Sequence, residues 1–244
     1  MRPTNPAEHW GTTFQHLAEH WERRRQAQAS APAPAFTVAL TREAGALGTS
    51  IAQEIGRRLG WPVYDHSLLE QIAEDLGVRT NLVESVDERR KGWLLEMTEH
   101  LLAVPTVSET AYLRRLLETV LALGAHGECV IVGRGAAFVL PPETTLRVRL
   151  VAPLEERVKV LAERLGLSHA EAERQAERLD RARADFVRQH FRKDPADPLN
   201  YDLFVNAARF TPAAAAGCVV EALRGLQATA AGRHQPPAGV PDKR

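Results

Sequence analysis

The sequence predicts an α/β fold in which a parallel sheet of about five strands is covered by helices on both faces. Two observations carry this prediction. Short β-branched and apolar runs alternate with segments of helical periodicity along most of the chain, a pattern typical of parallel strands joined by helices. The chain also has 244 residues, of which 44% are hydrophobic and 25% charged, as in an ordinary globular protein with a sizeable core.

The predicted strands are short runs rich in apolar and β-branched residues and bounded by turn signals. One of them, CVIV, is apolar throughout, which is typical of a strand buried on both faces. The predicted strands cover residues 36–40, 61–65, 129–132, 146–153 and part of 198–207.

The predicted helices repeat apolar residues every three or four positions. Ile51 begins an i, i+4, i+8 repeat that ends at Gly60. Ser168 and Glu171 have the spacing of a capping box at the start of a long charged helix, and Pro212 lies near the first turn of the last helix. The predicted helices cover 49–60, 66–78, two short pieces within 80–108, 111–127, 154–166, 168–194 and 211–226.

Both ends of the chain differ in composition from the part between them. Residues 1–35 contain a Pro/Ala linker at 29–35, and residues 229–244 are predicted to be a disordered tail after a domain at 36–228. A short amphipathic helix is expected before the linker, packed on the domain, on a partner or on a second copy. Its apolar residues recur at 4-3-4 spacing and are Trp10, Phe14, Leu17 and Trp21.

Composition argues against several classes of protein. Lys and Arg number 31, as do Asp and Glu, and aromatic residues make up 6%, so a nucleic-acid or anionic membrane partner is not expected. The sequence contains no apolar run of roughly 18 residues that could span a bilayer, and MRPTNPAEHW lacks the apolar region of a secretory signal. Cys129 and Cys218 both lie in apolar stretches and are expected to be reduced core thiols, which favours a cytoplasmic location.

The loop after the first strand is where chemistry is expected, because ligands of such sheets bind beyond the carboxyl ends of the strands. Its sequence TREAGALGTS leads into a helix, and backbone N–H groups of such a turn can hold a phosphate. Against the phosphate-loop pattern G-x-x-x-x-G-K-[ST], Arg42 stands at the first Gly, Leu47 at the second, Gly48 at the Lys and Thr49 at the hydroxyl position. An ordinary strand-to-helix turn is the alternative interpretation.

Several motifs in order resemble the cytidylate kinase-like family of P-loop proteins, over about residues 36–226. They are T-R-E-x-G-x-x-G-x-x-I-A, LGWPVYDHSLLEQIA, VIVGRGAAFVL, LRVRLVAPLEERV, Asp180-x-x-Arg183 with Phe186, and DPLNYDLFVNAARF. The resemblance implies a P-loop NTPase-type sheet with a helical insertion for a nucleoside monophosphate at about 75–110 and a helical lid at about 163–195. It also implies transfer of phosphate from ATP, with Mg²⁺, to CMP, dCMP or a similar nucleotide.

The resemblance and the residue chemistry together assign candidate roles. The catalytic candidates are Arg42, Asp180 and Arg183. The candidates for binding the ATP phosphates are Gly45, Ala46, Leu47, Gly48, Thr49 and Ser50, with Thr49 also a candidate Mg²⁺ ligand. The candidates for binding the acceptor nucleotide are Asp65, Arg114 and Arg134, and the second choices on the lid are Arg178 and Arg181.

Alternatives exist for several of these residues. Thr49 and Ser50 could serve only as helix caps and Asp65 only as a turn or cap, and Arg115 could replace Arg114 if the register is off by one. The charged helix could be a solvated face stabilised by its own ion pairs. The first lysine of the chain is Lys91, so Arg42 is the residue expected to supply the missing P-loop cation.

The sequence therefore leaves three functions open. The first is a nucleoside monophosphate kinase. The second is a nucleotide-binding or partner-binding protein without catalysis, which is favoured by the glycine-poor loop, the missing P-loop lysine and the N-terminal helix with its tryptophans. At the end of the third strand, Gly133-Arg134-Gly135 also stands where authentic cytidylate kinases have G-R-D. The third is a kinase of another small hydroxylated substrate.

Overall fold

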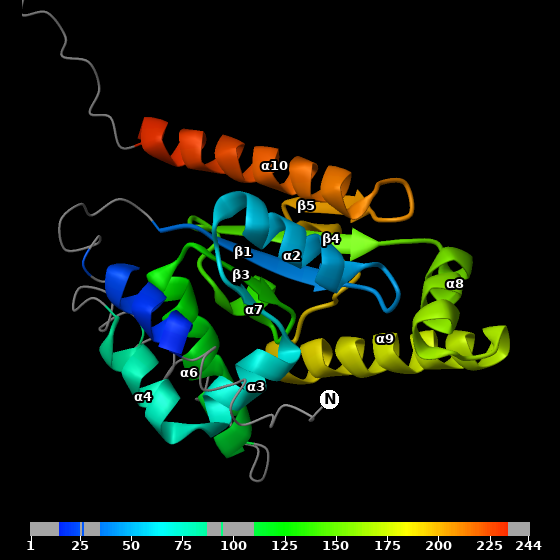
Figure 1. The fold of residues 1–244 in the computed structure, drawn as a ribbon, viewed down its shortest axis with the longest axis horizontal. Coiled ribbons are helices and arrows are strands. Elements are labelled where there is room, and N and C mark those ends of the chain that lie inside the picture. Colours follow the sequence, from blue (N-terminus) through cyan, green and yellow to red (C-terminus); the bar gives the residue numbers. More distant parts are fainter. Residues whose placement is uncertain (1–14, 25, 27–34, 87–93, 95–109, 234–244) are drawn as a thin grey trace, which may run out of the picture.

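The computed structural model describes residues 15–24, 26, 35–86, 94 and 110–233, and it contains one parallel five-stranded sheet. The strand order is β2-β3-β1-β4-β5, with helices packed on the sheet (Figure 1). This confirms the predicted α/β fold. The strands are β1 (Thr37–Arg42), β2 (Val63–Tyr64), β3 (Cys129–Val132), β4 (Thr145–Val151) and β5 (Leu203–Asn206).

The helices lie between the strands as the sequence predicts, with two differences. The single helix predicted at 66–78 is two helices that meet at Asp75, whose side chain caps the second by accepting from the Val78 N–H, and a short helix after β3 was not predicted. Ser168 and Glu171 form the expected capping box, and the last helix starts at Pro212. A helix at residues 15–24 precedes the sheet. The other helices are α2 (Gly48–Leu59), α3 (His66–Glu74), α4 (Leu76–Glu84), α6 (Thr110–His126), α7 (Ala136–Val139), α8 (Leu154–Leu165), α9 (His169–Phe191), the 3₁₀ turn Pro198–Asn200 and α10 (Pro212–Arg233).

The two faces of the sheet have separate cores, because side chains alternate along each strand. Val38 and Leu40 of β1 pack under α2 and α10. Ala39 packs on the other face, with α3, α6 and α7. The connection after β1 therefore covers one face, and the connection after β3 covers the other. Such a reversal opens a crevice at the carboxyl ends of the strands.

The helix pair α8 and α9 closes one side of this crevice. A small cluster holds the pair together, with Val158 and Leu161 of α8 against Ala172 and Ala176 of α9. Ala44, in the loop after β1, is part of the same cluster. Figure 1 shows α8 beyond the arrowheads of β1 and β4, with α9 running back along the sheet. The residues predicted to form a lid thus contact the loop predicted to bind phosphate.

The helix at residues 15–24 belongs to the core of the domain. Leu17 is 6% and Trp21 1% exposed, and Trp21 Nε1 donates a hydrogen bond to Tyr64 Oη at 2.8 Å. Trp10 and Phe14, from the same predicted repeat, lie outside the described residues. Of the alternatives left by the sequence, the structure places this helix on the domain.

Two sequence predictions differ from the structure, and a third falls largely outside the described residues. α10 continues to Arg233, past the predicted domain end at 228. Most of the predicted insertion, residues 87–93 and 95–109, lies outside the described residues. Cys129 is buried as expected, but Cys218 is exposed. The prediction for Cys218 was wrong because its turn of α10 buries Val219 and Val220 instead.

Candidate functional site

A cavity of about 390 Å³ lies at the carboxyl edge of the sheet, between the ends of β1, β3 and β4 and helix α9. Its wall is strongly basic. Two carboxylates, Glu43 and Asp180, and the aromatic rings of Phe138, Phe186 and Tyr201 also line it. The arginines in the wall are Arg42, Arg134, Arg149, Arg183 and Arg188. Guanidinium groups that converge on a cavity suit an anionic ligand, and above all phosphate.

Arg42 stands at the end of β1, and its side chain crosses the start of α2. A Cβ added to Gly48 would lie 2.7 Å from Arg42 Cγ, and one added to Gly133 would lie 2.5 Å from an Arg42 terminal nitrogen. The absence of a side chain at Gly48 thus makes room for Arg42. Among the described carboxylates none forms a salt bridge with Arg42. Burial, and then the charges of Arg183 and Arg134, lower the pKa of Arg42 to about 10.

Asp180 of α9 fastens the loop after β1. Its Oδ1 accepts a hydrogen bond from the Ala44 N–H at 2.8 Å, and its Oδ2 accepts one from Arg157 at 2.7 Å. Arg157 also donates to the Ala44 carbonyl at 3.1 Å and lies 3.3 Å from Glu43. Both carboxylates of the cavity wall are therefore engaged by Arg157, which holds the loop, α8 and α9 together.

Sequence reasoning missed Arg157, which is only 8% exposed. Its signal was present: Arg157 follows Leu154 by three positions and precedes Val158 and Leu161 on the apolar stripe of the predicted helix. An arginine on an apolar stripe has to find buried partners. The partners here are the carbonyl oxygens of Ala44 and Ala152 and the carboxylate of Asp180.

The loop carries two residues in the left-handed region, Gly45 with φ 83° and Leu47 with φ 52°. A Cβ at Gly45 would lie 2.4 Å from the Arg157 carbonyl oxygen, so a side chain there would clash. Leu47 adopts the left-handed conformation despite its side chain, at a cost of about 1–2 kcal/mol. Ile51 N–H donates to the Leu47 carbonyl, so the first-turn amides before Ile51 have no acceptor within α2.

The six loop residues proposed to bind ATP are not part of the described cavity wall. The wall includes Glu43 of the same loop but none of residues 45–50, so these six residues lie next to the cavity. Ala46 is buried, whereas the side chains of Thr49 and Ser50 are exposed at the start of α2. The structure therefore presents a helix N-terminus and an arginine cavity next to each other.

Arg134 lies in a tight turn after β3, where three consecutive residues have positive φ, with Arg134 at 49°. Its guanidinium pairs with Glu70 of α3. Glu70 also accepts a hydrogen bond from Tyr112 Oη at 2.7 Å and lies 2.9 Å from His66 Nδ1. A Cβ at Gly135 would come within 2.2 Å of the Phe191 ring, so the aspartate of the G-R-D pattern has no room here.

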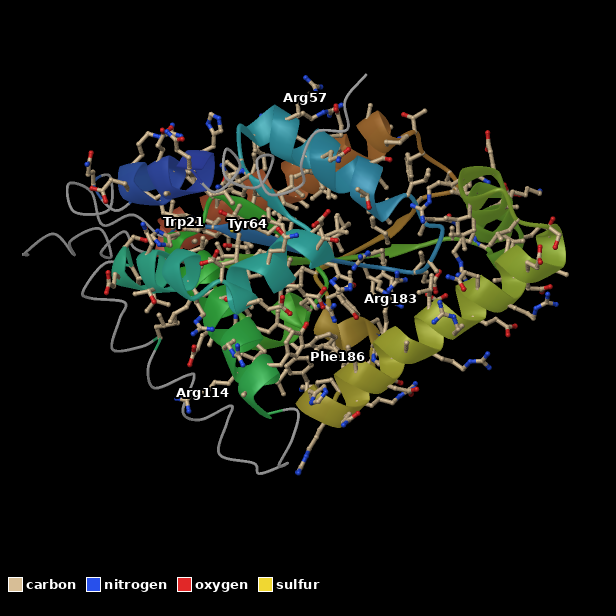
Figure 2. All side chains as sticks on the ribbon, turned by 60° about the horizontal axis from the view of Figure 1, so that its bottom comes forward. Trp21, Arg57, Tyr64, Arg114, Arg183 and Phe186 are labelled. Carbon is tan, nitrogen blue, oxygen red and sulfur yellow. The ribbon has the colours of Figure 1, made fainter. Side chains whose placement is uncertain are left out.

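Arg183 projects from α9 toward the ends of the strands (Figure 2) and lies 3.3 Å from Asp180. Burial lowers its pKa, as do the charges of Arg149 and Arg157, while Asp180 opposes this effect. Arg149, another residue that sequence reasoning missed, enters the cavity from β4. Its signal is the alternation of arginine with apolar residues in LRVRL.

The remaining sequence-predicted residues lie elsewhere. Asp65 caps α3, because its side chain accepts a hydrogen bond from the Leu68 N–H at 3.0 Å, and its charge partly offsets the lowering of the Arg42 pKa. Arg114 pairs with Glu118 at 3.0 Å on the exposed side of α6, away from Arg183 (Figure 2). Arg115 is exposed on the same helix and donates to the Ala111 carbonyl.

Arg178 and Arg181 are exposed on α9. Arg178 donates to Gln175, and Arg181 lies 3.5 Å from Glu177. Neither is in the wall of the arginine cavity. Of the predicted residues, the structure thus brings together Arg42, Arg134, Asp180 and Arg183.

The described residues contain no group of three or more His, Cys, Asp or Glu side chains that could hold a metal ion. No helix of the described part is long and apolar enough to cross a membrane.

The chain is similar in sequence or in structure to several known proteins. A uronate isomerase of Corynebacterium glutamicum is 36% identical over 93 residues, but these cover 38% of this chain and only 18% of that protein. A cytidylate kinase of Ignicoccus hospitalis is 33% identical over 178 residues, which cover 71% of this chain and 86% of that protein. An uncharacterized protein from Eubacterium ventriosum has a similar structure, with a TM-score of 0.60, 18% identity, and coverage of 78% of this chain and 98% of that one.

The sequence pattern of the cytidylate kinase-like family matches residues 37–209. This range begins at β1, ends after β5 and includes the whole arginine cavity. The chain therefore belongs to the cytidylate kinase-like family.

Proposed function

We propose that the protein transfers phosphate from ATP to a nucleoside monophosphate such as CMP or dCMP. The observation that carries this proposal is the Arg42 guanidinium, which forms no salt bridge with a described carboxylate and lies beside the N-terminus of α2. A cation and a helix N-terminus together favour binding of a terminal phosphate. Phosphoryl transfer depends mainly on such positioning and charge stabilisation.

At the donor end, the amides of Gly45 to Ser50 would hold the ATP phosphates. Because Gly48 has no side chain, the Arg42 side chain can pass over the start of α2. Arg42 would there supply the charge that a lysine supplies in the full P-loop pattern. Thr49 is exposed in the first helical turn, and its hydroxyl fits as one oxygen ligand of Mg²⁺ bound with the nucleotide. Bound Mg²⁺ would neutralise part of the charge that develops on the phosphates.

At the acceptor end, Arg134 would bind the acceptor nucleotide, and Arg183 would reach the transferring phosphoryl group from α9. Arg134 is oriented by Glu70, and Arg183 is carried by α9, which Asp180 ties to the loop after β1. Asp180 would therefore act by positioning α9 and the loop. Excluding water from such a site favours transfer to the acceptor over hydrolysis.

A second candidate is a nucleotide-binding protein without turnover. The observation that favours it is the engagement of both cavity carboxylates, Glu43 and Asp180, by Arg157. With these groups tied to Arg157, neither is placed to activate a hydroxyl acceptor. An acceptor phosphate, already ionised, needs no such base.

A coupled assay of ADP formation separates these candidates. Wild type would be tested with ATP·Mg²⁺ and CMP, dCMP, other nucleoside monophosphates and small hydroxylated acceptors, beside Arg42→Gln and the control Arg57→Gln. Arg57 points away from the molecule on α2 (Figure 2) and pairs with Glu54. Turnover with CMP or dCMP, lost in Arg42→Gln but not in the control, is expected. Binding of ATP without turnover of any acceptor would support the second candidate instead.

A further inference from the structure

Two arginines of β4 face the same side of the sheet, because residues two apart in a strand share a face, but they have different partners. Arg147 donates to both carboxylate oxygens of Asp202, at 2.6 and 3.1 Å. Arg149 forms no salt bridge with a described carboxylate, and it lines the cavity. Strand β4 thus holds one paired arginine outside the cavity and, inside it, one arginine without an ion-pair partner among the described carboxylates.

Arg149 lies beside a buried tyrosine that is itself held by several contacts. Its guanidinium carbon lies 5.9 Å from the centroid of the Tyr201 ring. Tyr201 is 7% exposed and donates from its hydroxyl to the Pro195 carbonyl at 3.0 Å. Phe138 and Phe204 pack edge-on against the same ring. Tyr201 also forms a side-chain hydrogen bond with Arg149. This tyrosine therefore orients the guanidinium, and the remaining N–H groups of Arg149 can bind a planar or tetrahedral anion.

Two of the cavity arginines, Arg42 and Arg149, lie on different sides of the cavity. Arg42 reaches toward Gly133, after β3, whereas Arg149 lies over Tyr201, on the β4 side. Arg183 of α9 lies near both of them. The charge of Arg183 lowers the pKa of Arg42, and the charge of Arg149 lowers the pKa of Arg183. Transfer between two phosphates requires two anionic groups to be held at once.

We propose that Arg149 holds the anionic group of the acceptor while Arg42 holds the terminal phosphate of the donor. This inference rests on the proposed function and names the side of the site that each substrate occupies. The group expected at Arg149 is a phosphate monoester dianion. Arg183, between the two, would contact the phosphoryl group in transit.

With the two substrates placed in this way, the transfer forms one bond and breaks one. An oxygen of the acceptor phosphate forms a bond to the γ-phosphorus of ATP, and the bond from that phosphorus to the bridging oxygen breaks. The electron pair of the broken bond stays on the ADP oxygen. No proton has to leave the acceptor, which explains why the site can work with both wall carboxylates, Glu43 and Asp180, tied to Arg157.

The test separates donor from acceptor binding. Arg149→Gln, Arg149→Lys and the matched control Arg147→Gln would be compared with wild type in three measurements: the KM for CMP in the coupled assay, calorimetric titration with inorganic phosphate, and titration with a Mg²⁺-bound non-hydrolysable ATP analogue. For Arg149→Gln we expect the KM for CMP and the Kd for inorganic phosphate to rise at least about tenfold. The Kd for the ATP analogue should change less than about twofold.

Arg149→Lys should recover part of the affinity for inorganic phosphate, because it restores the charge but not the planar fork. Arg42→Gln should show the reverse pattern, with weaker binding of the ATP analogue and retained binding of inorganic phosphate. The Arg147→Gln variant leaves Asp202 without its ion-pair partner. If that variant does not fold, Arg57→Gln serves as the control for loss of a charge.

Three results would overturn the inference: an unchanged KM for CMP in Arg149→Gln, an equal loss of ATP-analogue binding, or the same loss in the control variant. A wild type that turns over no acceptor overturns the proposed function. In that case the inorganic phosphate titration of Arg149→Gln decides the inference separately. A wild type that binds neither inorganic phosphate nor the ATP analogue overturns both.

Discussion

The helix at residues 15–24 and the arginine cavity handle their polar groups in opposite ways. Around the helix, two polar side chains have specific partners, Trp21 with Tyr64 at 2.8 Å and Arg24 with Glu128 at 2.6 Å, although His20 Nε2 has no partner among the described residues. In the cavity, Arg42 and Arg149 form no salt bridge with a described carboxylate, although each lies close to Arg183. The first region is organised for stability, and the second leaves charge available for a ligand.

This difference has an energetic consequence. A buried charge without a partner is unfavourable, so the cavity lowers the stability of the unliganded protein. An anion that binds there restores the missing interactions and stabilises the folded state through linkage. Changes near the helix should therefore affect folding, whereas changes in the cavity should affect binding.

The largest effect is expected for Trp21→Ala. Truncation would leave a cavity in the core and deprive the buried Tyr64 hydroxyl of its donor, so the free energy of unfolding should fall by about 4 kcal/mol. Urea denaturation measures this loss. The Kd for inorganic pyrophosphate, measured on the folded protein, should stay the same. A weakened pyrophosphate affinity would break the division between the two regions.

Arg42→Gln should have the next largest effect, now on binding. We expect about a 100-fold weaker affinity for the Mg²⁺-bound ATP analogue, equivalent to about 2.7 kcal/mol, as measured by calorimetry. Because burial and nearby arginines lower the pKa of Arg42 to about 10, the unliganded variant should be about 1 kcal/mol more stable than wild type. Arg57→Gln is the control for loss of a charge. A destabilised Arg42→Gln would contradict the energetic comparison.

Asp180→Asn should have an intermediate effect, on the attachment of α9 to the loop beside the cavity. The amide keeps an acceptor for the Ala44 N–H but loses the ionic bond to Arg157. We expect a loss of about 1–2 kcal/mol in unfolding free energy and faster hydrogen exchange at Ala44. Arg178→Gln, at an exposed position of the same helix, is the control and should change neither measurement. Unchanged exchange at Ala44 in Asp180→Asn would show that α9 does not hold the loop.

The last effect concerns pH and the helix at residues 15–24. Burial, followed by the charges of Arg23 and Arg24, lowers the pKa of His20 from 6.5 to about 4, and its Nε2 is buried without a hydrogen-bond partner in the described part of the chain. The unfolded chain takes up a proton near pH 6.5 and the folded chain only near pH 4. Stability should therefore fall as the pH drops from 6.5 to 4, by about 1–2 kcal/mol.

Chemical denaturation at several pH values, followed by Trp fluorescence, measures this slope. His20→Asn should flatten it between pH 6.5 and 4, and His16→Asn, at an exposed position, should leave it unchanged. An equally steep slope in His20→Asn would assign the effect to another group.

Local patterns were sufficient to predict much of the fold. The apolar run at β3, the stop at Gly60 and the capping box at Ser168 are signals read within a few residues. The sequence also predicted that Arg42, Asp180 and Arg183 belong to one site, and the structure brings them to one cavity. Which substrate each of them contacts stays a prediction.

Arg149 and Arg157 could not be assigned from the sequence because their roles depend on long-range neighbours. Arg147 and Arg149 look alike in LRVRL, and only the position of Asp202 makes one of them paired. Arg157 acquires its partners when α9 brings Asp180 against the loop after β1. Likewise, Trp21 is a core residue because Tyr64 is its partner, 43 positions further along the chain.

The most direct test of the central claim is the thermal unfolding of wild type and an Arg42→Gln/Arg149→Gln double variant at rising concentrations of inorganic pyrophosphate. If the unpaired arginines of the cavity bind phosphate groups, the Tm of wild type rises with pyrophosphate concentration and the Tm of the double variant does not. An equal rise in both proteins, or no rise in wild type, would contradict the account.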